Sequence, residues 1–348
     1  MHDPTSLEIS REQWRRNRAD AIRDLIDQYA SGDHGDLLSQ MFVTICRLAA
    51  DGADRGELKI LNTALRELRY AFKVFRPYAG IRKVSMFGSA RTPEDHPQYL
   101  QAKQFAELIQ ARGWMIITGA GDGIMRAGNH GATRDASFGV SISLPFEQSA
   151  NTIIADDPKL VNFRYFFTRK LVFLKEANAI VLFPGGFGTQ DEGFESLTLV
   201  QTLKTSPTPI VLCDEPGGTY WQHWQEYIRA ELLSAGMIGT DDLNLFFLTD
   251  RAEDAVAEIL KFYKRYHSSR YVGDQFVIRM ERPLSLETLA EINDTFADIL
   301  KEGTYEQAPG PLEGEDGELP EKARLIFAFN RQDAGRLRCL INRINEAP

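Results

Sequence analysis

Three glycine-rich turns in the sequence have the composition of phosphate-binding loops. They are Phe87-Gly-Ser-Ala-Arg91, Thr118-Gly-Ala-Gly-Asp-Gly-Ile-Met125 and Pro184-Gly-Gly-Phe-Gly-Thr-Gln-Asp-Glu192. Each turn follows a short apolar run and precedes a helical segment, which is the arrangement of a strand, a turn and a helix. Glycine lets backbone N–H groups approach an anion, and a helix N-terminus adds about half a positive charge. The turns therefore predict an anion site.

A simpler explanation exists for each turn alone, because tight strand-to-helix geometry needs glycine in any case. Three such turns at one edge of a sheet favour a ligand site over this explanation. Two familiar fingerprints are absent. Ile124 stands where the dinucleotide fingerprint has its third glycine, and neither glycine-rich loop ends in Gly-Lys-Ser or Gly-Lys-Thr. A phosphate site is expected, while NAD and ATP are not supported.

Acidic residues follow the third turn. Glu192, Glu195 and Thr198 recur at three-residue steps, which places them on one face of the helix that this turn opens. Acidic residues in a first helical turn also complement the helix dipole, and this explanation is sufficient for Asp191. Glu192 is expected at the cleft.

Two adjacent cations, Arg169 and Lys170, lie upstream of the same strand among aromatic residues. They are either part of a solvated face or charges held against the sheet. In the second case they need a partner, and a phosphate or Glu192 would serve.

The segments that carry these turns alternate between strands and helices over residues 79–265. The predicted strands are 84–87, 114–118, 140–144, 179–183, 209–213 and 245–248. This alternation is typical of βαβ units with a parallel sheet buried on both faces. We therefore expect a doubly wound, Rossmann-like α/β domain that binds its ligand at the carboxyl ends of the strands.

Two further segments flank this domain. Residues 1–78 are expected to form a helical N-terminal extension, interrupted at 31–35 and 50–56. Residues 266–348 are expected to form a small α+β module. Its predicted strands and helices are 275–280, 285–300, 324–329 and 333–344. Within it, the acidic segment 309–320, rich in proline and glycine, is expected to be a mobile loop.

The composition excludes several classes of protein. The 348 residues carry a net charge of −9, which argues against nucleic-acid binding. Three cysteines are too few for a disulfide framework, and the six histidines form no ligand cluster, so no metal is expected. The N-terminus has no apolar leader, and no apolar run approaches the roughly 18 residues of a membrane helix. We therefore expect a cytoplasmic protein that does not bind membranes.

Together these motifs resemble the LOG (LONELY GUY) family of nucleoside 5′-monophosphate phosphoribohydrolases, formerly described as lysine decarboxylase-like. The family's Pro-Gly-Gly-x-Gly-Thr-x-x-Glu hallmark is matched in full by residues 184–192, and its upstream Arg-Lys pair by Arg169 and Lys170. The turns at 87–89 and 119–125 also fit. The sequence departs from the family's usual Gly-Gly-Gly, which is Gly-Ala-Gly here.

The resemblance implies hydrolysis of the N-glycosidic bond of a nucleoside 5′-monophosphate to free base and ribose 5-phosphate, without a cofactor. The substrate would be AMP-like or a cytokinin riboside monophosphate. Glu192 would stabilise the ribosyl cation and deprotonate the attacking water, and Arg169 would bridge the phosphate or ribose to Glu192. The residues expected to bind the nucleotide are Gly88, Ser89, Gly119, Gly121, Glu147, Lys170, Gly185, Gly186, Gly188, Thr189 and Thr198. The resemblance also implies a homodimer or a larger homo-oligomer.

Two alternatives to a phosphoribohydrolase differ in how well they fit the sequence. A lysine decarboxylase needs pyridoxal phosphate on a Schiff-base lysine, and a sheet domain without an aminotransferase-like half does not match it. A non-catalytic nucleotide binder, acting as a sensor or carrier, would use the same pocket. The terminal segments would then be regulatory or assembly additions. The preferred base stays open in either case.

Overall fold

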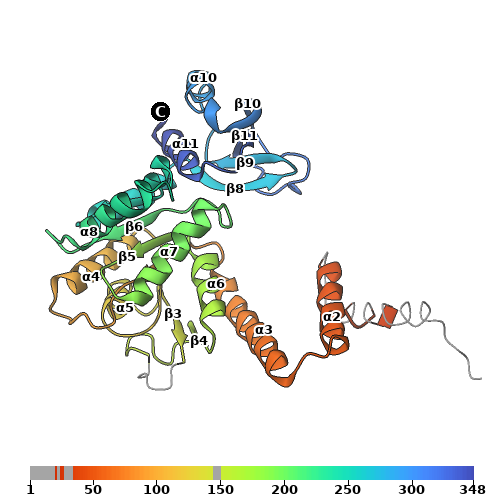
Figure 1. Cartoon of the computed structure of the whole chain (residues 1–348), viewed down its shortest axis with the longest axis vertical. Helices are drawn as coiled ribbons and strands as arrows, with labels where there is room; N and C mark the ends of the chain where they lie inside the picture. Colours follow the sequence, from red (N-terminus) through yellow and green to blue (C-terminus); the bar gives the residue numbers. More distant parts are fainter. Residues whose placement is uncertain (1–19, 22–23, 27–33, 144–149) are drawn as a thin grey trace, which may run out of the picture. The chain divides into compact units, whose positions relative to one another are not determined.

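The computed structural model of the chain describes residues 20–21, 24–26, 34–143 and 150–348 (Figure 1). The chain divides into two compact units, residues 1–65 and residues 66–348, and each is described by itself. Most of the N-terminal stretch before Gly35 lies outside the described residues; of the helix predicted there, residues 20–21 and 24–26 are described, and they are helical. None of the described helices is long and apolar enough to cross a membrane.

The first unit contains α2 (Gly35–Ala50) and the start of α3 (Arg55–Phe75), as the helical pattern predicts. Helix α3 begins at a capping box. The N–H of Asp54 donates to Glu57 Oε2 at 2.8 Å, and the N–H of Glu57 donates to Asp54 Oδ1 at 2.8 Å. These bonds satisfy N–H groups that the first turn of a helix cannot pair internally.

Seven described strands form a parallel sheet in the second unit, in the order β4-β3-β2-β1-β5-β6-β7. They are β1 (Lys83–Phe87), β2 (Met115–Thr118), β3 (Ser137–Ile142), β4 (Leu160–Phe163), β5 (Ala179–Leu182), β6 (Ile210–Cys213) and β7 (Phe246–Thr249). The predicted α/β fold is therefore confirmed. The prediction missed β4, which lies at the edge of the sheet.

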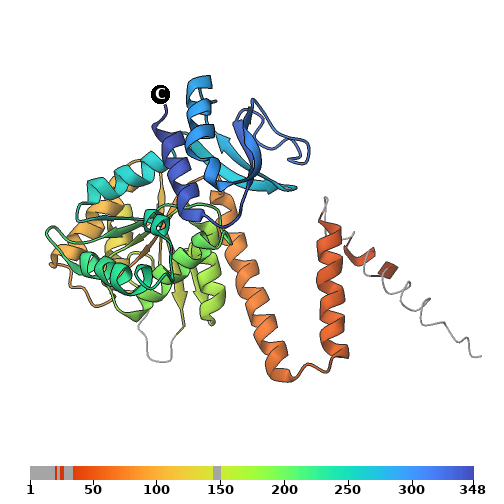
Figure 2. The ribbon, with the colours of Figure 1, turned by 45° about the horizontal axis from the view of Figure 1, so that its top comes forward.

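Helices cover both faces of the sheet, as Figure 2 shows. They are α4 (Pro97–Gln110), α5 (Ile124–Ala132), α6 (Phe166–Glu176), α7 (Phe187–Gln201), α8 (Tyr220–Tyr227) and α9 (Ala252–Phe262). Helices α4, α5 and α9 pack on one face, and the end of α3 packs with α6, α7 and α8 on the other. The described residues of the second unit also form three 3₁₀ segments and one π-helical segment: η1 (Arg76–Tyr78), η2 (Ile228–Leu233, π), η3 (Thr240–Leu245) and η4 (Ala297–Ile299).

The central strands are buried at every position, which explains their unbroken apolar sequences. In β1, Val84 and Met86 enter one core cluster, while Phe87 enters the cluster on the opposite face. The one hydroxyl in this strand, Ser85 Oγ, donates to the carbonyl of Phe173 at 2.8 Å. This buried bond connects β1 to α6, so the core also fixes the helix that carries Arg169 and Lys170.

The direction of winding reverses at β1. Strands β2, β3 and β4 continue on one side of β1, whereas β5, β6 and β7 continue on the other. In an open parallel sheet, the connections at such a point leave in opposite directions and open a crevice at the carboxyl ends of the two strands. The turns after β1 and β5 are the first and third glycine-rich turns.

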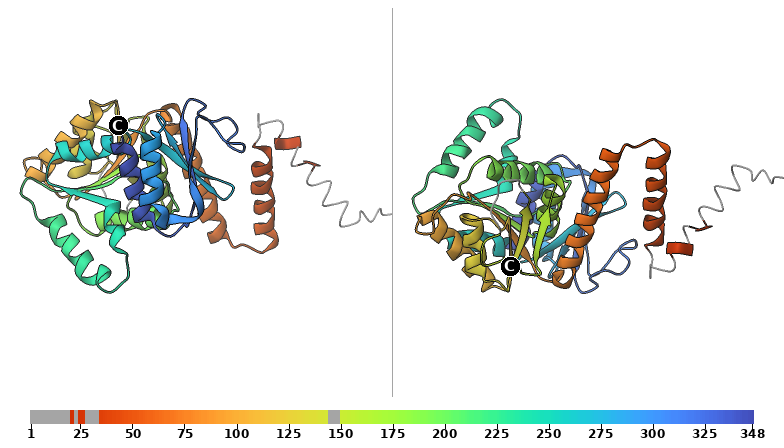
Figure 3. Two further views of the ribbon diagram at one scale, coloured as in Figure 1. Left: turned by 90° about the horizontal axis from the view of Figure 1, so that it is seen from above. Right: turned by 90° about the horizontal axis from the view of Figure 1, so that it is seen from below.

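The C-terminal part of the second unit forms an antiparallel sheet in the order β10-β11-β9-β8. Its elements are β8 (Tyr266–Val272), β9 (Gln275–Met280), α10 (Leu286–Thr295), β10 (Leu300–Ala308), β11 (Ala323–Phe329) and α11 (Ala334–Glu346). Helices α10 and α11 pack on one face of this sheet (Figure 3). Ser285 caps α10 by accepting from the N–H of Thr288 at 3.1 Å, as predicted.

Two sequence-based expectations for this module are wrong. The helix expected to reach residue 300 ends at Thr295, and Leu300 begins β10. The edge strands β8 and β10 were not predicted. Their burial patterns are mostly half-buried or exposed, so they lack the apolar run or the clean alternation that indicates a strand.

The segment 309–320 is anchored to the sheet rather than free. Glu315 is fully buried and accepts hydrogen bonds from Arg279 Nε at 2.8 Å, Arg324 Nε at 3.0 Å and the N–H of Leu312 at 2.9 Å. Burial alone would raise the pKa of Glu315, but these hydrogen bonds lower it to about 2. The expectation of a mobile loop is therefore wrong at this position.

Replacing Glu315 by glutamine should lower the free energy of unfolding by about 3–5 kcal/mol, because buried Arg324 loses its counter-charge and Arg279 keeps only its contact with Glu318. The depressed pKa makes this stabilisation complete above the ordinary glutamate value of 4.5 and progressively lost as the pH falls toward about 2. Urea denaturation at pH 7 and at pH 3 measures both effects. Glu313→Gln, at an exposed neighbour, is the matched control. Equal stability of the two variants at pH 7 would contradict the assignment.

Candidate active site

A cavity of about 770 Å³ opens at the carboxyl ends of β1 and β5, where the winding of the sheet reverses. Its walls come from the turns after β1, β2 and β5 and from helices α6 and α7. The turns are joined by backbone bonds. The N–H of Ser89 donates to the carbonyl of Pro184 at 3.1 Å, and the N–H of Ile124 donates to the carbonyl of Ser89 at 3.0 Å. The three glycine-rich turns thus form one connected wall.

Gly123 holds the second turn against the first. Its φ is +61°, and an added Cβ would lie 2.2 Å from the carbonyl oxygen of Ser89. Helix α5 begins directly after it and donates its first N–H, from Ile124, to that same oxygen. Glycine is required here by both backbone angle and space, so this residue serves the geometry of the turn.

The turn after β5 leads directly into α7, for which Gly186 is the N-cap. The N–H groups of Thr189 and Gln190 both donate to the carbonyl of Gly186 at 3.1 Å. The N–H groups of Phe187 and Gly188 come before the first N–H that bonds within the helix, so they can be paired by a ligand or by water. A Cβ added at Gly186 or Gly188 would meet nothing within 4 Å. Open space therefore borders the helix N-terminus, as an anion site requires.

Glu192 lies on the second turn of α7 and is buried, with 4% of its surface exposed. Arg169 Nη2 lies 3.6 Å from its Oε1, and Lys170 Nζ lies 3.7 Å from its Oε2. Burial raises the pKa of Glu192 above its ordinary value, while the charges of Lys170 and Arg169 act in the opposite direction. The result is a carboxylate at the cavity wall that gains a proton more readily than an exposed glutamate.

Both cations are held in place by further contacts. The guanidinium of Arg169 lies 5.0 Å from the ring centroid of Phe166 and 5.6 Å from that of Phe173. Lys170 Nζ contacts Asp191 Oδ2 at 2.8 Å and Glu195 Oε2 at 2.5 Å. Burial lowers the pKa of Lys170, but these two hydrogen bonds raise it above its ordinary value. Lys170 therefore stays charged.

The structure brings most of the predicted site residues to this cavity. Those that line it are Gly88, Ser89, Gly119, Arg169, Gly185, Gly186, Gly188, Thr189 and Glu192. Lys170 lies behind Glu192 rather than on the wall, and Gly121 is also absent from the described lining. Thr198 is exposed, further along α7, and does not line the cavity. Glu147 lies outside the described residues.

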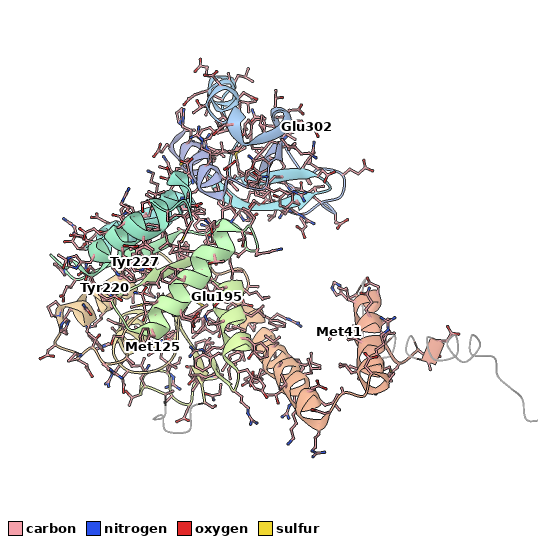
Figure 4. All side chains as sticks on the ribbon, in the orientation of Figure 1. Met41, Met125, Glu195, Tyr220, Tyr227 and Glu302 are labelled. Carbon is pink, nitrogen blue, oxygen red and sulfur yellow. The ribbon has the colours of Figure 1, made fainter. Side chains whose placement is uncertain are left out.

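Three polar residues of the wall, Arg91, Gln190 and Tyr220, were missed by the sequence analysis. The Tyr220 hydroxyl donates to the carbonyl of Gly185 at 2.6 Å, and Gln190 Nε2 donates to the Tyr220 oxygen at 2.6 Å. Figure 4 places Tyr220 at the start of α8. The available signals were the position of Arg91 in the first turn and that of Tyr220 after a predicted strand.

No group of histidine, cysteine, aspartate and glutamate side chains within the described part of the chain is arranged to hold a metal ion. Among the described residues, the only cations that line the cavity are Arg91 and Arg169, and the undescribed segment 144–149 contains no lysine. A Schiff base would need a lysine amine at the cavity, so the residues do not fit pyridoxal phosphate chemistry.

Comparison with known proteins agrees with the motifs. Residues 119–259 match the family described as "Possible lysine decarboxylase". A cytokinin riboside 5′-monophosphate phosphoribohydrolase from Mycobacterium marinum is 28% identical over 167 residues, which are 46% of this chain and 85% of that protein. The protein of the same name from Mycobacterium tuberculosis is 26% identical over 167 residues, which are again 46% of this chain and 85% of that protein. The resemblance stated from the sequence is confirmed for the α/β domain.

Solved structures with a similar fold include a molybdenum cofactor binding protein from Rippkaea orientalis, at 16% identity and a TM-score of 0.36. The match covers 51% of this chain and 94% of that one. The molybdenum cofactor carrier protein of Chlamydomonas reinhardtii is 19% identical with a TM-score of 0.37, covering 52% and 97%. Similarity at this level has no bearing on function.

Two neighbouring glycines of the third turn should respond differently to alanine. At Gly185 a Cβ would lie 2.1 Å from Thr189 Oγ1 and 3.0 Å from the N of Ser89, whereas at Gly186 it would meet nothing within 4 Å. Gly185→Ala should therefore lower the free energy of unfolding by about 1–3 kcal/mol through overpacking. Gly186→Ala, the control, should stay within about 0.5 kcal/mol of the parent. Thermal unfolding of both variants tests this, and a reversed order would contradict the turn geometry.

Proposed function

We propose that this chain, whose α/β domain resembles the LOG family, hydrolyses the N-glycosidic bond of a nucleoside 5′-monophosphate. The products would be the free base and ribose 5-phosphate. The observation that carries the proposal is Glu192, a buried carboxylate between two cations at the wall of a cavity with an open glycine turn. The names of the two mycobacterial relatives support the same reaction.

The 5′-phosphate would bind at the N-terminus of α7. The turn at 185–189 offers free space beside Gly186 and Gly188, and the helix dipole favours negative charge there. Arg91 and Arg169 add positive charge to the same wall. Binding energy from the phosphate, which does not react, would position the ribose for the reaction.

Glu192 would then act on the ribose. As the N-glycosidic bond breaks, its electron pair goes to the departing base, and positive charge develops at C1′ and the ring oxygen. The Glu192 carboxylate stabilises this charge and accepts a proton from the attacking water, whose oxygen bonds to C1′. The departing base takes up a proton from solvent, and Glu192 afterwards releases the proton that it accepted, so that the net step consumes one water. The raised pKa of Glu192 makes this carboxylate a stronger base than an exposed glutamate.

Arg169 and Lys170 would have separate roles. Arg169 lines the cavity and lies 3.6 Å from Glu192, so it can contact the phosphate or ribose and orient the carboxylate. Lys170 does not line the cavity and acts from behind, as a positioning residue. The preferred base is a finer proposal: an AMP-like nucleotide or a cytokinin riboside monophosphate. The homo-oligomer implied by the family also stays a prediction.

Incubating the protein with AMP, GMP, CMP, UMP and IMP in turn, with chromatography of free base and ribose 5-phosphate, tests the reaction. We expect release from at least one, and a fall in kcat of about 10²- to 10⁴-fold in Glu192→Gln with nucleotide binding retained. Glu226→Gln is the matched control, because Glu226 on α8 is exposed and does not line the cavity. Tight binding without any product would instead favour a nucleotide sensor or carrier.

Removing the charge of Lys170 should shift the acidic limb of the pH profile of kcat/KM to higher pH. Glu192 must be ionised to act as a base, and Lys170 is the first of the two cations that lower its pKa against the effect of burial. In Lys170→Met the pKa of Glu192 therefore rises, and activity is lost at a higher pH as the solution is acidified. Lys103→Met, on α4, is the control. An unchanged limb would exclude an electrostatic role for Lys170.

A further inference from the structure

A second cavity, of about 710 Å³, lies on the far side of α6 from the candidate active site. Its walls come from α6, the end of α7, the loop 204–208 and the start of β8, so it lies between the parallel sheet domain and the C-terminal module. It is close in volume to the first cavity.

Helix α6 forms a wall of both cavities. Arg169 and Phe173 line the first, whereas Phe167, Leu171 and Leu174 line the second. Phe167 and Leu171 are 55% and 47% exposed, so the second cavity has an uncovered apolar side. A ligand with an apolar or ring portion would remove this surface from water.

The opposite side of the second cavity is polar and basic. Lys175 and Lys204 line it, together with His267, whose pKa is lowered by burial, and one lining carboxylate, Glu195. Lys175 Nζ also contacts Glu176 Oε1 at 2.6 Å, a carboxylate that does not line the cavity and that a phosphate would have to displace or share. Hydroxyl groups of Thr205, Ser206, Thr208 and Ser268 complete this side. No described carboxylate lies within 4.0 Å of Lys204 in the chain. Lysines with several hydroxyls are the donors that a phosphate group recognises.

The loop that carries Lys204 is held in an uncommon backbone conformation. Leu203 has a φ of +57°, a region that β- and γ-branched side chains seldom enter. The turn is fixed because the N–H groups of Lys204 and Thr205 both donate to the carbonyl of Leu199, at 2.9 and 3.3 Å. The Leu203 side chain packs against both core clusters that flank it. The fold therefore sustains a strained residue where the loop begins.

Glu195 connects the two cavities. It lines the second cavity and accepts a hydrogen bond from Lys170 at 2.5 Å, and Lys170 Nζ lies 3.7 Å from Glu192 Oε2. Figure 4 labels Glu195 on α7, the helix that also carries Glu192. A negative charge in the second cavity would thus act on Glu195, whose ion-pair partner Lys170 also faces Glu192.

We propose that the second cavity binds a small phosphorylated metabolite, its phosphate at Lys175 and Lys204 and its apolar portion on α6, and that this ligand lowers turnover through Glu195 and Lys170. The regulatory half rests on the proposed function, since it requires catalysis by Glu192. The binding half does not. Negative charge beside Glu195 competes with Glu192 for the Lys170 ammonium group and so weakens the electrostatic support of Glu192.

Isothermal titration of the full chain with inorganic pyrophosphate tests the binding half. We expect two sites. Gly186→Val, which fills the glycine turn of the first cavity, should abolish binding there and leave only the site in the second cavity. Lys175→Ala/Lys204→Ala should lower the affinity of the second cavity by about tenfold for each lysine removed. Lys264→Ala/Lys301→Ala, at exposed lysines outside both cavities, is the control.

The variants separate the two proposals. If Lys175→Ala/Lys204→Ala titrates like the parent, the second site does not exist and the inference is overturned. If Gly186→Val titrates like the parent while the double lysine variant loses a site, the phosphate site of the proposed function is wrong and the inference stands. A parent protein that binds no pyrophosphate at all would overturn both.

Turnover at saturating nucleotide tests the coupling. Competition at the first cavity changes KM alone, whereas a ligand in the second should lower kcat by at least about fivefold. Glu195→Gln should keep the second binding site and lose this response. The coupling would be overturned if the ligand lowered kcat in Glu195→Gln as much as in the parent. It would also be overturned if kcat of the parent did not fall while the second cavity is occupied.

Discussion

The candidate site depends on one electrostatic constraint, a buried carboxylate that must have cations beside it. Taking Glu192 out of water is costly unless opposite charge is close, and Arg169 and Lys170 supply that charge from α6. Helices α6 and α7 must therefore lie together. Aromatic rings hold Arg169, and the carboxylates of Asp191 and Glu195 hold Lys170. The helix pair is a single charged unit, and Glu192 lines the cavity beside the glycine turn.

The core of the fold could be predicted from the sequence, whereas most of its edges could not. Strands β1, β2, β5 and β6 are buried on both faces, so each has a short apolar run that indicates a strand by itself. The three missed strands, β4, β8 and β10, all lie at the edge of a sheet. Edge strands have one free side and carry polar residues that limit unwanted pairing. The same property removes the apolar signal on which the prediction depends.

The candidate site was predicted wherever glycine or charge was unusual for its position. The turns at 87–91 and 184–192 and the pair Arg169 and Lys170 met that condition. Tyr220 and Gln190 did not, because a tyrosine after a strand and a glutamine in a helix are common. Only the folded structure shows that Gln190 donates to Tyr220 and that Tyr220 donates to Gly185. The place of Lys170 behind Glu192 could not be predicted either, since sequence spacing gives a helix face but not the depth of a side chain.

The hydrogen bond from Tyr220 to Gly185 has an optical consequence. The ring of Tyr220 meets that of Trp221 edge-on, with centroids 4.8 Å apart, and Trp221 in turn lies 5.9 Å from Trp224. Two indoles are thus coupled through one phenol to the glycine turn of the cavity. A ligand that shifts this turn changes the surroundings of both fluorophores. The chain therefore carries its own unlabelled reporter of occupancy, which can be followed in stopped-flow emission on the timescale of binding.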